Sequence, residues 1–144
     1  AINEVSVFRQ SKQTTQLEIR INKKKKIKEL VGDGVLVATP AGSTAYNLSA
    51  KGPILNLESQ YLAVTPISPF KPRGWRGIIV SNKSKILITN LNTKKRPVTA
   101  VADNIEIKNI KSVEIGLNKN KKFILLYNKK YGLKERNLAE QFKF

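Results

Sequence analysis

Short β-rich runs separated by polar turns dominate this sequence and limit the folds open to it. The run at residues 16–21 alternates apolar and polar side chains, a pattern that buries one face of a strand and leaves the other in water. The turns carry Lys, Asn, Gly, Asp and Pro, as turn geometry requires. So many closely spaced runs predict a mainly β fold, a two-sheet β-sandwich-like domain. The expected strands span residues 2–8, 16–21, 35–39, 61–67, 77–80, 85–89, 97–102, 104–107, 112–115 and 122–127.

Two helical segments interrupt the β pattern. The first is a short helix over residues 44–50, with Ser43 as its expected N-cap and Gly52-Pro53 as its stop signal. The second is a C-terminal helix over residues 133–142, whose few apolar residues predict a charged surface helix docked on the sheets.

The composition excludes several kinds of chemistry. The 144 residues suit one domain. There is no Cys and no His, so disulfides, thiolate nucleophiles, His-dependent triads and His- or Cys-based zinc sites are excluded within these residues. No apolar run approaches the roughly 18 residues of a membrane span, and the first residues lack a secretory signal. We therefore expect a cytoplasmic protein without a membrane partner. The sequence also has no Met, which favours a processed chain or a piece of a longer one.

The net charge of +17 predicts attraction to anions such as nucleic acid, acidic membranes or nucleotide phosphates. Lys supplies 21 of the 27 basic residues, whereas nucleic-acid sites lean on Arg for bidentate contacts. The Lys run at residues 23–26 is accordingly interpreted as a solvated loop.

The densest chemical signal lies at residues 32–49. It predicts a tight Gly-Asp-Gly turn, an apolar strand, a Pro-Ala-Gly corner and a helix start. The first N–H groups of that helix, around Thr44, Ala45 and Tyr46, are expected to lack intrahelical partners and to face a ligand. Tyr46 offers a flat ring and a hydroxyl. The pattern suits a nucleotide, although a capped helix after a strand is also an ordinary connection.

The same stretch closely resembles the signature of the NAD kinase family. It reads Gly-Asp-Gly, a four-residue apolar strand, then Thr-Pro-x-Gly-Ser-Thr-Ala-Tyr. Asn3-Glu4 is similar to the family's Asn-Glu motif and lies at a similar distance ahead of it. The resemblance runs in order along essentially the whole chain. Further runs similar to family members are residues 48–54, 62–69, 70–77 and 135–142.

The resemblance implies a role for each matching residue. Glu4 would accept hydrogen bonds from a ribose diol, and Asn3 would contact the adenosine. Asp33 would receive the nicotinamide amide. Thr44, Ala45 and Tyr46 would contact the adenosine and the diphosphate, and Ser49 would add a contact one helical turn further on. Ser68 would reach a ligand held by a neighbouring subunit. At Ala41 the family often has Thr or Ser, so Ala41 would contribute through its backbone alone.

The family transfers the γ-phosphoryl group of ATP to the adenosine ribose 2′-hydroxyl of NAD, giving NADP. The resemblance therefore implies NAD as substrate, ATP and Mg²⁺ for the complete enzyme, and a homo-oligomer, dimer or tetramer. It makes residues 1–144 the C-terminal NAD-binding domain. The family's N-terminal α/β ATP-binding domain, with its catalytic Gly-Gly-Asp-Gly aspartate, is absent from these residues. We expect no catalytic residue and no metal ligand in this chain, and no kinase activity from it alone.

Two other readings stay open. A lipid kinase of the same broad superfamily would also have a β-rich C-terminal domain, but the Thr-Pro-Ala-Gly-Ser-Thr-Ala-Tyr stretch with Asn3-Glu4 favours a nucleotide acceptor. A basic β protein that binds nucleic acid would need clustered aromatic residues for stacking. The one Trp, four Tyr and five Phe do not cluster on one strand, so we expect no nucleic-acid partner.

Overall fold

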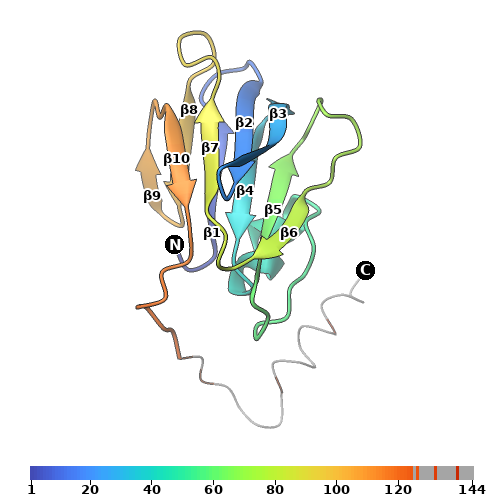
Figure 1. Ribbon diagram of the computed structural model, residues 1–144, viewed down its shortest axis with the longest axis vertical. Helices are drawn as coiled ribbons and strands as arrows, with labels where there is room; N and C mark the ends of the chain where they lie inside the picture. The colour runs from blue at the N-terminus through green and yellow to red at the C-terminus, as the bar shows by residue number, and fades with distance from the viewer. Residues whose placement is uncertain (125, 127–131, 133–138, 140–144) are drawn as a thin grey trace.

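The computed structural model describes residues 1–124, 126, 132 and 139. Within them two antiparallel sheets face each other (Figure 1). The six-stranded sheet has the order β6-β5-β4-β1-β8-β9, and the four-stranded sheet has the order β10-β7-β2-β3. The strands are β1 Glu4–Arg9, β2 Thr15–Ile21, β3 Lys24–Gly32, β4 Gly34–Ala38, β5 Tyr61–Ile67, β6 Ile78–Ser81, β7 Ile86–Asn90, β8 Val98–Ala102, β9 Ile105–Ile107 and β10 Ser112–Ile115.

This architecture confirms the predicted mainly β, two-sheet fold, and nine of the expected runs coincide with observed strands to within two residues at either end. The tenth expected strand, at residues 122–127, is wrong where the structure describes it, because residues 122–124 and 126 adopt no regular structure. The expected C-terminal helix at residues 133–142 lies outside the described residues except for Ala139.

Strand β3 is the element that the sequence pattern missed. Its Lys-rich start looked like a solvated loop, yet Lys24 and Lys25 pair with β2 opposite Ile21 and Arg20. The connecting residues Asn22 and Lys23 both have positive φ, 50° and 67°, which is the geometry of a two-residue hairpin turn that follows strand twist. Because β3 is an edge strand, its lysines can stay in water while they discourage pairing with a second chain.

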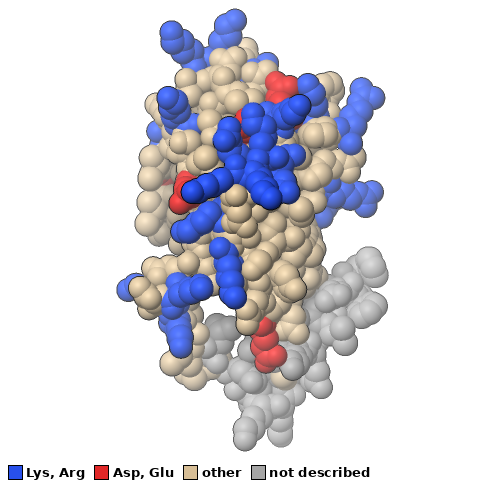
Figure 2. All heavy atoms as spheres, viewed as in Figure 1, with Lys and Arg blue, Asp and Glu red and all other residues tan. Residues whose placement is uncertain are grey.

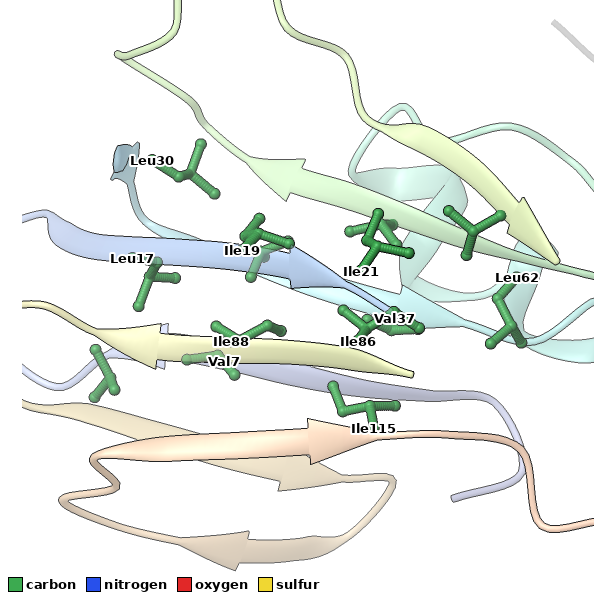
Figure 3. Packing of buried hydrophobic residues seen from close by; sticks show 14 residues of the cluster. Val7, Leu17, Ile19, Ile21, Leu30, Val37, Leu62, Ile86, Ile88 and Ile115 are labelled. Carbon is green, nitrogen blue, oxygen red and sulfur yellow. The ribbon is translucent and has the colours of Figure 1, made fainter. Parts of the chain in front are cut away.

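The main core fills the space between the sheets (Figure 3). Alternate residues of β1 and β4, such as Val7 and Val35, point inward and meet Leu17 and Ile19 of β2, all at most 1% exposed. Alternation of this kind fixes the register, since a slip of one residue would turn every apolar side chain outward. The residues between them, Glu4 and Phe8 included, therefore lie on the outer face of the six-stranded sheet.

That outer face is covered by the connection between β4 and β5. The connection holds a 3₁₀ turn, η1 Ala41–Thr44, and a single α-helical turn, α1 Tyr46–Ser49. Its apolar residues, Tyr46 and Leu55 among them, pack against Leu36 and Ala63 of the sheet. The expected helix at 44–50 is thus shorter than predicted, and Ser43 is not its N-cap: Ser43 lies inside the 3₁₀ turn and is fully buried.

The outer face of the four-stranded sheet is polar and strongly basic. Lys and Arg gather over the part of the surface formed by β2, β3 and β7 (Figure 2). Among them lies Glu18, whose carboxylate is 2.6 Å from Arg20 and 2.5 Å from Lys25 and whose side chain is only 10% exposed. These partners hold the pKa of Glu18 below its ordinary value.

Candidate functional site

The start of β1 and the 3₁₀ turn lie in direct backbone contact. The N–H of Thr39 donates to Asn3 O at 2.9 Å, and the Thr39 hydroxyl donates to Ile2 O at 2.7 Å. Gly42 sits so close to Asn3 that a Cβ placed on it would fall 2.2 Å from Asn3 O. The Asn-Glu pair and the Gly-Ser-Thr-Ala-Tyr turn, far apart in sequence, are therefore neighbours in the fold.

Glu4 carries the most informative side chain of this junction. It stands on the outer face of β1, opposite Ala38 of β4, and is half-buried. Its Oε2 atom is buried without a hydrogen-bond partner among the described residues. Burial, together with the nearby charge of Asp103, raises the pKa of Glu4. A buried acceptor in this condition costs stability, which makes it a candidate for contact with a ligand donor.

Asp103, in the turn between β8 and β9, fixes the backbone beside Glu4. Its carboxylate accepts hydrogen bonds from the N–H groups of Ile2, Asn3 and Glu4. Burial works to raise the pKa of Asp103, but these hydrogen bonds outweigh it and lower the pKa. Sequence reasoning missed this role, because nothing in a turn aspartate reveals which distant backbone it will hold.

Tyr46 lies across the outer face from Glu4. Its ring is 5.7 Å from the ring of Phe8, centroid to centroid, in a tilted arrangement. Burial raises the pKa of the Tyr46 hydroxyl, and the charges of Asp33 and Glu4 add to the effect. The structure thus brings Glu4, Tyr46 and Asp33 within electrostatic reach of one another. Phe8, which the sequence did not single out, belongs to the same surface.

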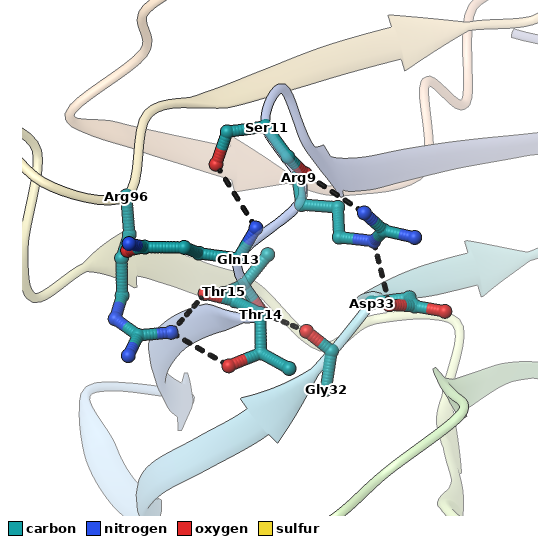
Figure 4. A network of polar contacts seen from close by, with 8 residues as sticks. All are labelled: Arg9, Ser11, Gln13, Thr14, Thr15, Gly32, Asp33 and Arg96. Atoms are coloured by element: carbon teal, nitrogen blue, oxygen red, sulfur yellow. Dashed lines mark hydrogen bonds and ion pairs between the residues drawn. The ribbon is translucent and has the colours of Figure 1, made fainter.

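Asp33 marks the point where the chain passes from β3 in one sheet to β4 in the other. Its N–H donates to Ile67 O at 2.9 Å, and its carbonyl accepts from the N–H of Arg9 at 3.0 Å. Its carboxylate oxygen Oδ1 pairs with Arg9 Nε at 2.6 Å (Figure 4). The flanking glycines serve close approach rather than a left-handed turn: a Cβ on Gly34 would lie 2.1 Å from Val7 O. The expected tight turn is therefore a crossover corner.

Of the three N–H groups expected to face a ligand, those of Thr44, Ala45 and Tyr46, one is engaged within the turn, as are two that precede them. The N–H of Gly42 donates to the Thr39 hydroxyl at 3.1 Å, and that of Ser43 donates to Pro40 O at 3.3 Å. The N–H of Ala45 donates to Gly42 O at 3.0 Å, so this predicted ligand contact is already engaged. A single turn of α-helix also has too small a dipole for a strong anion site.

A buried polar clamp holds the turn in place. Asn47 is fully buried and donates to Ser43 O at 3.1 Å and to Pro53 O at 2.8 Å, while its Oδ1 accepts from the Thr65 hydroxyl at 2.6 Å. The Ser43 hydroxyl accepts from Leu55 N–H at 3.0 Å. Every side-chain polar group of Asn47 is engaged. The clamp therefore fixes the turn against β5 without help from a ligand.

The other predicted contacts are distributed around this surface. Ala41, Thr44 and Tyr46 are half-buried along the turn whose Gly42 contacts Asn3. Ser49 is exposed at the end of α1. Ser68 is exposed just beyond β5, with a φ of 46°, and lies near the Asp33 corner, since its carbonyl is 3.0 Å from a Cβ placed on Gly32.

Other possible sites are less well formed. No group of three or more His, Cys, Asp or Glu residues that could hold a metal ion occurs in the described part of the chain. None of its helices is long and apolar enough to cross a membrane. A cavity of about 220 Å³ lies between the β8–β9 hairpin and β10. Its lining, with Ile105, Ile107 and Val113, is mostly apolar and includes none of the predicted site residues.

Comparisons with known proteins identify the family of this chain. Residues 2–127 match the family model of the ATP-NAD kinase C-terminal domain. The NAD kinase of Rhizorhabdus wittichii is 51% identical over 142 residues, covering 99% of this chain and 55% of that protein. The NAD kinase of Brucella suis biovar 1 is 52% identical over 143 residues, covering 99% and 56%. The chain thus spans about half the length of these curated relatives.

Solved structures give the same result. An NAD kinase from Archaeoglobus fulgidus, crystallised in complex with ATP, superposes with a TM-score of 0.73 and 26% identity, covering 83% of this chain and 46% of that one. Yeast NADH kinase complexed with NADH gives a TM-score of 0.69 and 30% identity, covering 80% and 34%. The chain belongs to the ATP-NAD kinase C-terminal domain family.

Proposed function

We propose that this chain is the NAD-binding portion of an NAD kinase, which phosphorylates the adenosine ribose 2′-hydroxyl of NAD with ATP to give NADP. The family membership and the relatives named NAD kinase support the reaction class. The observation that carries the proposal is the buried Oε2 of Glu4, which has no hydrogen-bond partner within the described part of the chain and lies beside the Asn3–Gly42 contact.

A ribose diol suits Glu4 for a physical reason. An ionised carboxylate is an acceptor only, and two adjacent hydroxyls can donate to its two oxygens at once. The desolvation that raises the pKa of Glu4 would be offset by those bonds. Asn3, held by Asp103 on the same stretch of backbone, lies where its amide can meet the adenosine. The Tyr46 ring and hydroxyl supply an apolar face and a polar tip.

The far end of the same surface suits the second half of the dinucleotide. Asp33 pairs through its backbone with Arg9, the last residue of β1, while Glu4 is the first. Five residue steps along a strand span about 17 Å, which fits an extended dinucleotide better than a single nucleoside. We assign the adenosine to the Glu4 end and the nicotinamide to the Asp33 end. Thr44, Ala45, Tyr46 and Ser49 line the stretch between, with Ala41 offering its backbone alone.

The proposal extends to the complete enzyme. Residues 1–144 act as the C-terminal NAD-binding domain, and ATP, Mg²⁺ and the catalytic aspartate belong to an N-terminal α/β domain, since these residues contain no Gly-Gly-Asp-Gly run. The described residues offer no carboxylate cluster that fits Mg²⁺, so we place no metal step in them. The enzyme would work in the cytoplasm as a homo-oligomer in which Ser68 reaches a ligand of the neighbouring subunit.

What this domain contributes to the reaction is orientation of the acceptor. Phosphoryl transfer depends chiefly on positioning and on neutralising charge. Hydrogen bonds from the diol to Glu4 would fix the 2′-hydroxyl on the outer face of the sheet, and the Asn47 clamp would keep the facing turn rigid. The 144 residues alone should give no NADP from ATP and NAD.

Calorimetric titration of NAD into the purified chain tests the proposal. Glu4→Gln should weaken binding about 100-fold, since it exchanges two charge-assisted hydrogen bonds for weaker ones. Glu106→Gln, on the exposed edge strand β9, is the matched control and should leave the affinity unchanged. Equal affinity in parent and Glu4→Gln would overturn the site. Binding of diacylglycerol, or of nucleic acid with steep salt dependence, in place of NAD would favour the alternative functions.

A further inference from the structure

We propose that the Arg9–Asp33 ion pair removes most of the electrostatic preference of the acceptor site for one redox state of the nicotinamide ring. The oxidised and reduced dinucleotides are then accepted with comparable efficiency. This inference rests on the proposed function and concerns the same site. It assigns Arg9 as a specificity-determining residue.

Figure 4 shows the contacts that fix the pair in place, and its side chains remain partly exposed. Arg9 Nε lies 2.6 Å from Asp33 Oδ1, and Arg9 Nη1 donates to Ser11 O at 2.8 Å. The two residues are also joined through the backbone, by the N–H of Arg9 and the carbonyl of Asp33. Their side chains are nevertheless 39% and 38% exposed, so a ligand can reach them.

The pair suits a primary carboxamide on chemical grounds. A carboxamide has one acceptor oxygen and one NH₂ donor group. The guanidinium supplies donors and the carboxylate supplies an acceptor, side by side. An unpaired Asp33 would satisfy only the NH₂ half of the group. The ring attached to this carboxamide would then lie within a few ångströms of both charges and near Tyr46. Burial raises the pKa of the Tyr46 hydroxyl, and the charge of Asp33 raises it further.

The charge of the nicotinamide ring determines how the ion pair affects the choice between the oxidised and the reduced dinucleotide. The nicotinamide ring carries one positive charge when oxidised and none when reduced. Asp33 alone would favour the cationic ring, and Arg9 alone would disfavour it. Because the two charges are adjacent, their fields largely cancel at the ring. Loss of either partner should therefore shift the preference, and the two losses should shift it in opposite directions.

The test compares kcat/KM for the oxidised and the reduced dinucleotide in the longest natural polypeptide that contains this chain. Arg9→Gln leaves Asp33 unbalanced and should raise the oxidised-to-reduced ratio about 3- to 10-fold, the effect of one unit charge roughly 6 Å away in a partly screened medium. Asp33→Asn should lower the ratio by a similar factor. The double variant should return it close to the parent value, and Arg9→Lys, which keeps the charge, should leave it there.

Lys25→Gln is the matched control, because Lys25 belongs to an ion pair with Glu18 on the other sheet. It should leave the ratio unchanged. If both single variants shift the ratio in the same direction, or neither shifts it, the inference is wrong even though both dinucleotides are turned over. If the parent uses neither dinucleotide, the proposed function itself fails. Loss of the shifts at high salt would support their electrostatic origin.

Discussion

Two glutamates on the outer faces of the two sheets have opposite surroundings. Glu18, on the four-stranded sheet, is held by Arg20 and Lys25, and its pKa is lowered. Glu4, on the six-stranded sheet, is half-buried, faces the charge of Asp103 and leaves Oε2 without a partner in the described structure; its pKa is raised. Both are glutamates on the outward face of a strand, so the difference in their pKa values comes from what the fold places around them.

The contrast separates a charge that stabilises the protein from one that is held ready for a ligand. The basic sheet satisfies its carboxylate internally. The other sheet places a carboxylate oxygen that has no partner among the described residues beside a turn held in place by Asn47 and Ser43. Rigid surroundings with one unmet acceptor are what a preorganised binding site requires.

Asn47→Ala should have the largest effect on stability. It leaves Ser43 O, Pro53 O and the Thr65 hydroxyl without their partner in a fully buried place, at a cost of about 3 kcal/mol. Urea denaturation monitored by circular dichroism measures this. Asn56→Ala, at an exposed position, should cost less than about 1 kcal/mol. Equal effects of the two would show that the turn is not clamped.

Gly42→Ala should disturb the junction that brings the two motifs together. Its new Cβ would lie 2.2 to 2.7 Å from the backbone atoms of Asn3, none of which can rotate away. We expect about 2 kcal/mol of destabilisation and a parallel loss of NAD affinity. Gly74→Ala meets open space and is strained only by a φ of 75°, so about 1 kcal/mol and unchanged affinity are expected. Unchanged NAD affinity in Gly42→Ala would contradict the proposal that the contact between Gly42 and Asn3 forms part of the NAD site.

Glu18→Gln should destabilise the chain by about 1 kcal/mol at pH 7, because it removes the anion between Arg20 and Lys25. The folded pKa of Glu18 lies below its ordinary value of 4.5. Its contribution to stability is therefore present above pH 4.5 and lost as the pH falls through the folded pKa. Thermal melts from pH 7 to pH 3 should show the parent and the variant converging. A constant difference would mean that the charge is not responsible.

Glu4→Gln should have the smallest effect on stability, and it should stabilise the chain at pH 7, whereas the three variants above destabilise it. The folded pKa of Glu4 lies above 4.5, so its protonated form is the one that folding favours. Its favourable contribution is complete below pH 4.5 and is lost as the pH rises through the raised pKa. At pH 7 the variant should gain about 0.5 kcal/mol, after allowance for solvent screening. Differential scanning calorimetry without NAD should detect it; a destabilised variant would contradict the contrast with Glu18.

The sequence predicted most of the fold, because alternation and turn residues carry that information locally. Residues 61–67 and 112–115 were placed to the residue. Strand β3 was not predicted, because its start at Lys24 and Lys25 is exposed at the edge of the sheet and shows no alternation of apolar and polar residues. The helix after the motif was overextended, since Ser43 turned inward to Leu55 instead of capping. Both errors come from contacts with residues distant in the sequence.

The candidate site was predicted in part. Asn3, Glu4, Asp33 and Tyr46 were chosen through a family resemblance. The structure puts Glu4 and Tyr46 on one outer face, Asn3 against Gly42, and Asp33 at the crossover corner, where its charge still acts on Tyr46. The partners that set their properties were not foreseen. Asp103 reaches Glu4 only through the β1–β8 pairing, and Arg9 meets Asp33 only through the β1–β4 pairing. Pairing across a sheet depends on topology, which a single sequence does not display residue by residue.

An NMR titration of the isotopically labelled chain with NAD tests the central claim most directly, since the two outer faces can be compared in one spectrum. The backbone signals of Asn3, Glu4 and Thr44 to Tyr46 should shift together and saturate with one dissociation constant, while those of Glu18, Arg20 and Lys25 stay in place. Shifts confined to the basic four-stranded sheet, with Glu4 and Tyr46 unmoved, would contradict the account.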